Sequence, residues 1–227
     1  MSEISSPLRT VRSFVIREGR FTDSQKRAFK NYWPQFGISL GQEQIGFSQF
    51  FSRRQPIVFD IGFGNGDSLL SIAQQRPDLN FVGIEVYRPG IGHCFQHLVE
   101  YNISNVRVIN ADVIDVLKTN VATGSLHGIL VWFPDPWPKK RHHKRRLINQ
   151  QFITEAVRAL HSKGVLHLAT DWQPYAQAME FQVNQCYALQ KMEPGFNPLQ
   201  LQRSETRFEK RGLRLGHRCS DLIYQRQ

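Results

Sequence analysis

The segment IVFDIGFGNGD, residues 57–67, starts as an apolar run rich in β-branched and aromatic side chains and continues into three closely spaced glycines. The run predicts a buried strand. Glycines allow a sharp turn and a close approach of the backbone to a ligand, at the positive end of the helix that follows. A strand, a glycine turn and a helix in this order indicate an open α/β sheet with a nucleotide-like cofactor at the turn.

The spacing of the glycines argues against a dinucleotide such as NAD. The turn contains Gly62, Gly64 and Gly66, and Asp67 stands where a dinucleotide fold has the glycine that passes the pyrophosphate. A structural turn followed by capping aspartates is the alternative interpretation of the same residues.

Carboxylates end the first three predicted strands, at Asp60, Glu85 and Asp112. Three carboxylates at one edge of a sheet are a poor cradle for phosphates, but they suit the sulfonium and amino groups of S-adenosylmethionine. Glu85 lies 19 residues after Gly66, at the spacing where a carboxylate accepts both ribose hydroxyls of an adenosine ligand. The carboxylates therefore favour S-adenosylmethionine as the cofactor.

Strand-like runs alternate with helix-compatible stretches along most of the chain. The runs are residues 57–62, 81–86, 106–112, 128–133 and 165–171, and residues 213–224 are expected to form a last strand. This alternation predicts one α/β domain with a mainly parallel sheet and helices on both faces. Residues 1–50 form a basic N-terminal arm of the same domain, with a helix from Asp23 to Trp33 stopped by Pro34, and residues 51–227 form its main part.

A second functional segment follows the fourth predicted strand. Asp135 stands between two prolines in FPDPW, so its carboxylate is presented at the strand end where ligands bind in open α/β sheets. Trp132, Phe133 and Trp137 could bracket a flat base by stacking. An ordinary turn at the end of a strand is the alternative.

The eight residues from Lys139 to Arg146 carry six positive charges, while the whole chain has a net charge of +10. This basic run consists of Lys139, Lys140, Arg141, His142, His143, Lys144, Arg145 and Arg146. It is expected to open a helix and to neutralise phosphates of a nucleic acid beside Asp135. A solvated helix face is the alternative, although like charges this crowded repel one another unless an anion relieves them.

The composition and the spacing of residues argue against a membrane-spanning protein, a disulfide-bonded protein and a metalloprotein. No apolar run approaches the length that spans a membrane, and the three cysteines are far apart, which fits a reducing compartment such as the cytoplasm. His93 and His97 have the i, i+4 spacing of metal ligands, but no Glu stands between them and no third ligand is expected within reach, so no metal is expected. The oligomeric state, monomer or homodimer, is left open.

From RSFVIREGR, which begins at Arg12, to SDLIY near the C-terminus, the chain resembles the bacterial-type tRNA (guanine-N7)-methyltransferases. FPDPW with the basic run carries the resemblance, together with IGFGNG, GIEV, ATDW and TRFE. The resemblance implies a Rossmann-like class I methyltransferase fold with a mixed seven-stranded sheet. It also implies S-adenosylmethionine as methyl donor, and a guanine in the tRNA variable loop as acceptor.

The resemblance also assigns site residues. It implies cofactor contacts at Asp60, Glu85, Asp112 and Asp135. It implies tRNA contacts at Lys139, the run from Lys140 to Arg146, Asp171, Thr206, Arg207, Phe208 and Glu209. The chain departs from the family pattern at Asp60, where Glu is usual, at Arg207, where Lys is common, and at Ser220, where an aromatic residue is usual.

Guanine N7 carries a lone pair and no proton, so its methylation needs no general base. Catalysis must therefore come from positioning in a partly dried pocket, with Asp135 holding the base and offsetting the positive charge left on the ring. Asp171 is expected either to act from the facing side or to cap the next helix. Two alternatives from other classes are a non-catalytic RNA-binding protein and an adenine amino-methyltransferase. The second is disfavoured because one proline, not two, follows Asp135.

Overall fold

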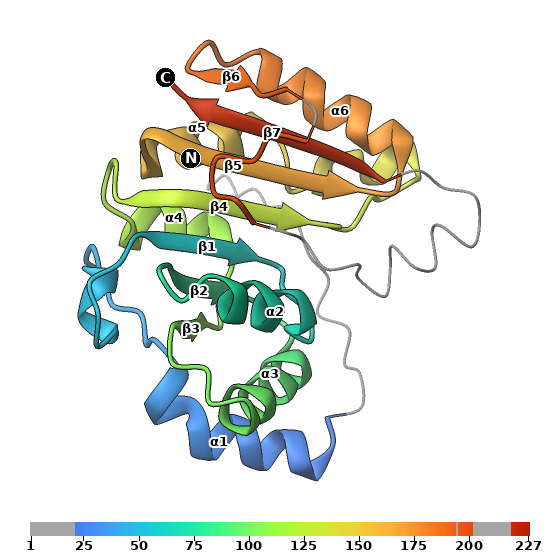
Figure 1. Ribbon diagram of the computed structural model, residues 1–227. Coiled ribbons are helices and arrows are strands. Elements are labelled where there is room, and N and C mark those ends of the chain that lie inside the picture. The colour runs from blue at the N-terminus through green and yellow to red at the C-terminus, as the bar shows by residue number, and fades with distance from the viewer. Residues whose placement is uncertain (1–20, 194, 202–218) are drawn as a thin grey trace, which may run out of the picture.

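The computed structural model describes residues 21–193, 195–201 and 219–227, which form a seven-stranded sheet with helices on both faces (Figure 1). The strands are β1 Ile57–Ile61, β2 Asn80–Ile84, β3 Val106–Ile109, β4 Leu126–Trp132, β5 Leu160–Thr170, β6 Leu189–Lys191 and β7 Ser220–Arg226. The α-helices are α1 Asp23–Phe36, α2 Asp67–Gln75, α3 Arg88–Glu100, α4 Val113–Asn120, α5 Gln150–Ala159 and α6 Gln173–Asn184. Two short 3-10 helices are η1 Phe47–Phe50 and η2 Lys140–Arg145.

The strand order is β3-β2-β1-β4-β5-β7-β6. Strands β1 to β5 pair in parallel, whereas β7 is antiparallel to both β5 and β6. The predicted mixed, mainly parallel sheet is therefore confirmed. The order reverses between β1 and β4, and the carboxyl ends on either side of such a reversal form the usual ligand-binding crevice of an open α/β sheet.

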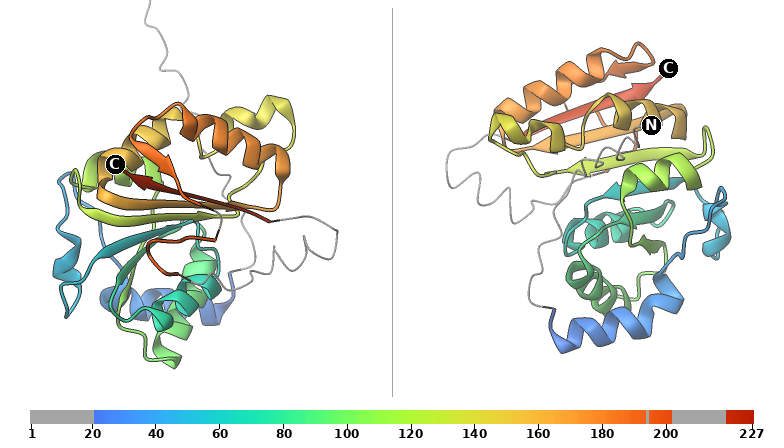
Figure 2. Two further views of the ribbon diagram at one scale, coloured as in Figure 1. Left: turned by 45° about the horizontal axis from the view of Figure 1, so that its top comes forward. Right: turned by 180° about the vertical axis from the view of Figure 1, so that it is seen from behind.

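Two apolar layers hold the helices on the sheet. One face packs β1 and β4 against α4, α5 and α6, through side chains that include Phe59, Phe152 and Met179. The other face packs against α2 and α3, through side chains that include Val58, Leu69 and Phe95. In Figure 1 α2 and α3 lie in front of the sheet, and the view from behind in Figure 2 brings α4 and α5 forward. Strand residues alternate between the two layers, as expected for a sheet buried on both faces.

The described part of the N-terminal arm packs against this core. Phe36 at the end of α1 contacts the Phe95 ring of α3 at 5.8 Å, and the N–H of Ile38 donates to the Val108 carbonyl of β3. None of the helices in the described ranges is long and apolar enough to cross a membrane.

Two local expectations are wrong. Helix α1 does not stop before Pro34 but continues to Phe36. A proline in the last turn breaks only one hydrogen bond of the helix, and the packing of Trp33 and Phe36 on Phe95 outweighs that loss.

The basic run does not open α5 either, because it forms the separate turn η2. Helix α5 starts later, at Gln150, where the side chain of Asn149 accepts a hydrogen bond from the Phe152 N–H at 3.0 Å. Asparagine is among the strongest N-capping residues, so the cap sets the start of the helix. The expected last strand, residues 213–224, is confirmed in its second half, because β7 spans Ser220–Arg226, while residues 213–218 lie outside the described residues.

Candidate active site

The glycine turn follows β1 and has the backbone that only glycine adopts without strain. Gly62, Gly64 and Gly66 have φ angles of +73°, +60° and +91°. Nothing lies within 4 Å of the positions that side chains at Gly62 and Gly64 would take, whereas a side chain at Gly66 would meet Cys94 Sγ at 2.8 Å. The first two glycines thus leave open space in front of the turn, and the third allows α2 and α3 to pack closely.

Glu85, just after β2, fixes this turn. Its Oε2 accepts a hydrogen bond of 2.8 Å from the Gly64 N–H, and its Oε1 accepts from the N–H groups of Val86 and Tyr87 at 2.7 and 3.0 Å. Burial raises the pKa of Glu85. The three hydrogen bonds lower that pKa, and the charge of Asp135 raises it. The carboxylate is therefore held in one orientation at the sheet edge.

Asp60 on β1 is in an unusual state for a carboxylate. It is only 2% exposed, and its Oδ2 has no hydrogen-bond partner among the described residues. Burial, and then the charge of Glu85, raises its pKa to about 7. A buried carboxylate without a compensating partner is costly, and strongly shifted groups of this kind concentrate at functional sites.

Asp112 completes the row of carboxylates at this edge. It is the N-cap of α4, where its Oδ1 accepts from the Ile114 N–H at 3.0 Å, and it is half-buried. Parallel pairing of β1 with β2 and of β2 with β3 brings the ends of all three strands to one side. The structure thus brings Asp60, Glu85 and Asp112 to the same edge, as the sequence predicts.

Asp135 lies at the same edge, after β4, and its side chain is exposed in the free chain. The residues on either side of its Pro-Asp-Pro segment, Phe133 and Trp137, have positive φ angles of 55° and 44°. Such angles are strained for bulky side chains and persist only where the surroundings enforce them. Trp132 does not bracket a ligand, because it is buried in the layer around α2 and α3.

Most of the basic turn is open to solvent. Lys139, Lys140, Arg141, His143 and Lys144 are exposed. His142 and Arg145 are half-buried around Trp137: Arg145 lies over its ring at 5.0 Å, and His142 meets it edge to face at 5.8 Å. The pKa of His142 is lowered by slight desolvation and then by the neighbouring cations, first among them Arg141.

Arg146 differs from the rest of the run because its side chain points inward. It is 8% exposed, its Nε donates to the Pro136 carbonyl at 2.9 Å, and its guanidinium lies 4.7 Å from the centre of the Tyr175 ring. Sequence reasoning missed this burial, since nothing in a run of consecutive basic residues distinguishes its last member.

Asp171 follows β5 and is half-buried. The N-cap position of α6 is occupied by Trp172 and not by Asp171, so the alternative that assigns Asp171 to that position is wrong. Thr206, Arg207, Phe208 and Glu209 lie outside the described residues.

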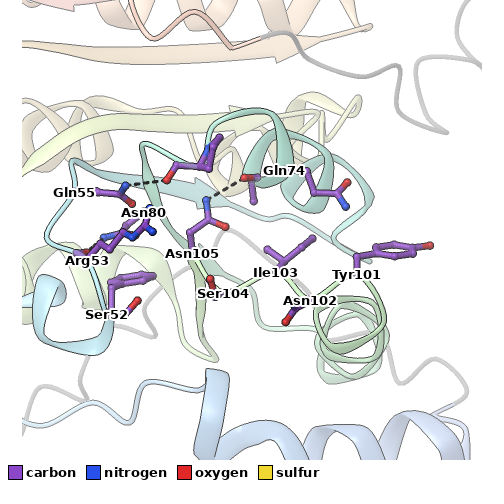
Figure 3. A pocket seen from close by; sticks show the side chains of 13 residues that line it. Ser52, Arg53, Gln55, Gln74, Asn80, Tyr101, Asn102, Ile103, Ser104 and Asn105 are labelled. Carbon is purple, nitrogen blue, oxygen red and sulfur yellow. Dashed lines mark hydrogen bonds between the residues drawn. The ribbon is translucent and has the colours of Figure 1, made fainter.

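Two other features lie apart from this edge. His93 and His97 stack on α3 with ring centres 4.3 Å apart, and His93 Nδ1 is 3.0 Å from the Asn65 carbonyl oxygen. In the described ranges, no group of three metal-ligating side chains occurs. A hollow of about 380 Å³ lies at the amino ends of β1 to β3, where Figure 3 shows Gln55, Asn80 and Asn105 facing it. It is on the opposite edge of the sheet from the carboxylates.

Comparisons with known proteins identify the family and the fold of the chain. A family model described as a putative methyltransferase matches residues 54–222. A tRNA (guanine-N(7)-)-methyltransferase of Pseudomonas paraeruginosa is 45% identical, over 97% of this chain and 91% of its own length. One of the same name from Alkalilimnicola ehrlichii is 44% identical, over 96% of this chain and 94% of its own length.

Among solved structures, a putative methyltransferase from Streptococcus mutans in complex with SAH has a TM-score of 0.52 at 13% identity and covers 79% of this chain and 93% of its own. That likeness shows the class I methyltransferase fold. On its sequence and its fold, the chain belongs to the tRNA (guanine-N7-)-methyltransferase family.

Proposed function

We propose that this chain transfers a methyl group from S-adenosylmethionine to N7 of a guanine in the variable loop of tRNA. The observation that carries the proposal is the position of Asp135, at one sheet edge with the carboxylates of β1 to β3 and directly before the basic turn. A cofactor edge and a polyanion surface therefore meet at a single carboxylate. The reaction takes place in the cytoplasm, where tRNA is matured.

The residues at the edge fit S-adenosylmethionine. The open space at Gly62 and Gly64 leaves room for a ligand against the backbone, and the unpartnered oxygen of Asp60 offers an acceptor for a cationic group. Glu85 uses three of its acceptor sites on backbone N–H groups, which leaves capacity for a ribose hydroxyl. When bound, S-adenosylmethionine supplies a methyl group on a positively charged sulfur.

The chemistry of the acceptor explains why no histidine or lysine base is needed at the edge. N7 of guanine attacks with its own lone pair, the bond from sulfur to methyl breaks as the bond to N7 forms, and no proton is transferred. The positive charge moves from the sulfur to the guanine ring. A fixed carboxylate beside the ring stabilises that charge, and the proposed role of Asp135 is to orient the base and provide this stabilisation.

Orientation of Asp135 depends on the loop that carries it. Prolines on both sides fix its backbone, and the Phe133 N–H donates to the Ala169 carbonyl of β5 at 2.8 Å. Because the side chain is exposed in the free chain, the expected dry pocket is completed by the bound guanine itself.

The surface around Asp135 fits the tRNA backbone. The exposed cations of η2 are proposed to bind phosphates, and Arg145 and His142 to bind them beside Trp137. Asp171, at the end of β5, and the segment from Thr206 to Glu209 are proposed as further tRNA contacts.

The function is tested by incubating the protein with bulk tRNA and methyl-labelled S-adenosylmethionine. The label should enter tRNA, and reduction with borohydride followed by aniline should cleave the product chain at the modified base, because that treatment opens N7-methylguanosine. A labelled tRNA that this treatment does not cleave, and whose label is found in methyladenine, would overturn the proposal. Calorimetry with S-adenosylmethionine alone distinguishes an inactive preparation, which binds it, from a non-catalytic RNA-binding protein, which does not.

A further inference from the structure

Arg146 is a buried cation at the junction of three elements of the proposed site. Its N–H donates to the His143 carbonyl of η2 at 3.0 Å, and its carbonyl accepts from the Asn149 side chain, the cap of α5, at 3.1 Å. Its guanidinium reaches the Pro136 carbonyl, one residue after Asp135. The face of the guanidinium packs on Tyr175, which is fully buried in the first turn of α6.

A guanidinium in this position is poorly suited to bind a phosphate. Phosphate ligands on a nucleic-acid surface have to reach out to the backbone, as the exposed cations of η2 do, whereas Arg146 is 8% exposed and directed into the protein. Within the described residues it forms no ion pair with a carboxylate. Its interactions are a hydrogen bond to a loop carbonyl and a stack on an aromatic ring, which is an arrangement that positions a loop.

We propose that Arg146 is a positioning residue, which holds the Pro-Asp-Pro loop, and with it the Asp135 carboxylate, against the start of α6. The proposal rests on the proposed function, since it concerns the geometry of that site. Loss of the contact would let the Pro136 carbonyl move, and the carboxylate one residue earlier would move with it. Both charged side chains lie close enough to the buried Tyr175 hydroxyl to act on its pKa, which Arg146 lowers and Asp135 raises.

Replacement of Arg146 by Lys separates a positioning role from phosphate binding. Lysine keeps the positive charge, so it would largely preserve a phosphate contact, but it lacks the planar group that stacks on Tyr175 while donating to Pro136. We expect Arg146→Lys and Arg146→Met to lower the single-turnover rate by about tenfold to a hundredfold at saturating tRNA and S-adenosylmethionine, because small displacements of a positioned group have effects of this size. The affinity for S-adenosylmethionine and the salt dependence of tRNA binding should match those of the wild type.

Arg145→Lys and Arg145→Met are the matched controls, because Arg145 is the neighbouring arginine and lies at the surface over Trp137. We expect Arg145→Met to reduce the salt dependence of tRNA binding, and Arg145→Lys to restore most of it. A phosphate ligand would behave differently: the single-turnover rate of Arg146→Lys would lie within about twofold of the wild-type rate, and tRNA binding by Arg146→Met would depend less on salt. That result would overturn the proposal. A wild-type protein that does not methylate tRNA would overturn the proposed function instead.

Tyr175 gives a second route if the Arg146 variants do not fold. Tyr175→Phe keeps the ring under the guanidinium and removes only the hydroxyl, which accepts from the Ile148 N–H at 3.3 Å. Tyr175→Met removes the ring. Turnover close to that of the wild type in Tyr175→Phe, with a loss in Tyr175→Met that leaves the salt dependence intact, supports the proposal. Full turnover in folded Tyr175→Met would contradict it.

Discussion

The backbone N–H of Gly64 donates a hydrogen bond of 2.8 Å to Oε2 of Glu85, so the glycine turn after β1 is fixed by the carboxylate that ends β2. The two proposed cofactor contacts are therefore mechanically coupled. A change at Glu85 alters both the acceptor for the ribose and the shape of the turn in front of it.

Glu85→Ala should weaken S-adenosylmethionine binding by roughly 1 to 3 kcal/mol, because it removes a charge-assisted acceptor and leaves the Gly64, Val86 and Tyr87 N–H groups without their partner. Glu85→Gln keeps the size and one acceptor, so its loss should be smaller. Isothermal titration calorimetry measures both variants. Equal affinity of wild type and Glu85→Ala would remove Glu85 from the site.

Asp60 should make the stability of the protein depend on pH. The pKa of Asp60 is about 7 in the folded protein, above the ordinary value of 3.8. The neutral carboxyl therefore stabilises the fold fully at pH values below 3.8, the pKa of the unfolded chain, and this stabilisation is lost as pH rises through about 7. Asp60→Asn cannot titrate. The free energy of unfolding of Asp60→Asn, relative to that of the wild type, should rise by on the order of 2 kcal/mol between about pH 5 and about pH 8. Urea denaturation measures both values.

The same replacement should weaken the binding of S-adenosylmethionine, because an amide carries no charge to attract a cation. A difference in stability that stays constant over this pH range would show that Asp60 titrates normally in the folded protein.

Arg145→Ala should weaken tRNA binding and reduce the slope of log affinity against log salt by about 0.7 to 0.9, the value for one phosphate contact. Arg53→Ala is the matched control, since Arg53 is exposed at the opposite edge of the sheet, beside the hollow of Figure 3. Filter binding over a series of salt concentrations gives both slopes. Identical changes in the two variants would mean that net charge, and not the basic turn, determines affinity.

His142 should take up a proton when tRNA binds. Its pKa lies below the ordinary value in the free protein because of slight desolvation and neighbouring cations, and phosphates placed beside it would raise that pKa. The affinity for tRNA should therefore increase as pH falls through the range where histidine titrates. In His142→Gln that increase should be absent. A wild-type affinity that is flat over this range would exclude a contact between His142 and a phosphate.

The sequence predicts the sheet and the glycine turn well, because both follow from local rules. The glycines at 62, 64 and 66 need positive φ angles, and the runs of buried side chains have the length and composition of parallel strands. The family and fold predicted from these motifs are confirmed. The roles of the individual site residues remain predictions.

What the sequence does not predict depends on tertiary contacts. The strand β6 has only three residues, Leu189–Lys191, and exists because it pairs with β7. Helix α1 passes through Pro34 because Phe36 packs on Phe95. The inward orientation of Arg146 requires Tyr175, which is 29 positions away in the chain. Each of these features requires a contact between residues that no local pattern connects.

The central claim is that Asp135 is the catalytic carboxylate at which the cofactor edge and the basic turn meet. Asp135→Asn is nearly isosteric and exposed, so the fold and most of the tRNA affinity should be preserved. The direct measurement is single-turnover methyl transfer at saturating tRNA and S-adenosylmethionine, with the melting temperature measured in parallel. The account predicts a rate about a hundredfold or more below that of the wild type, as for the loss of one preorganised electrostatic contact. A folded variant within a few fold of the wild-type rate would contradict it.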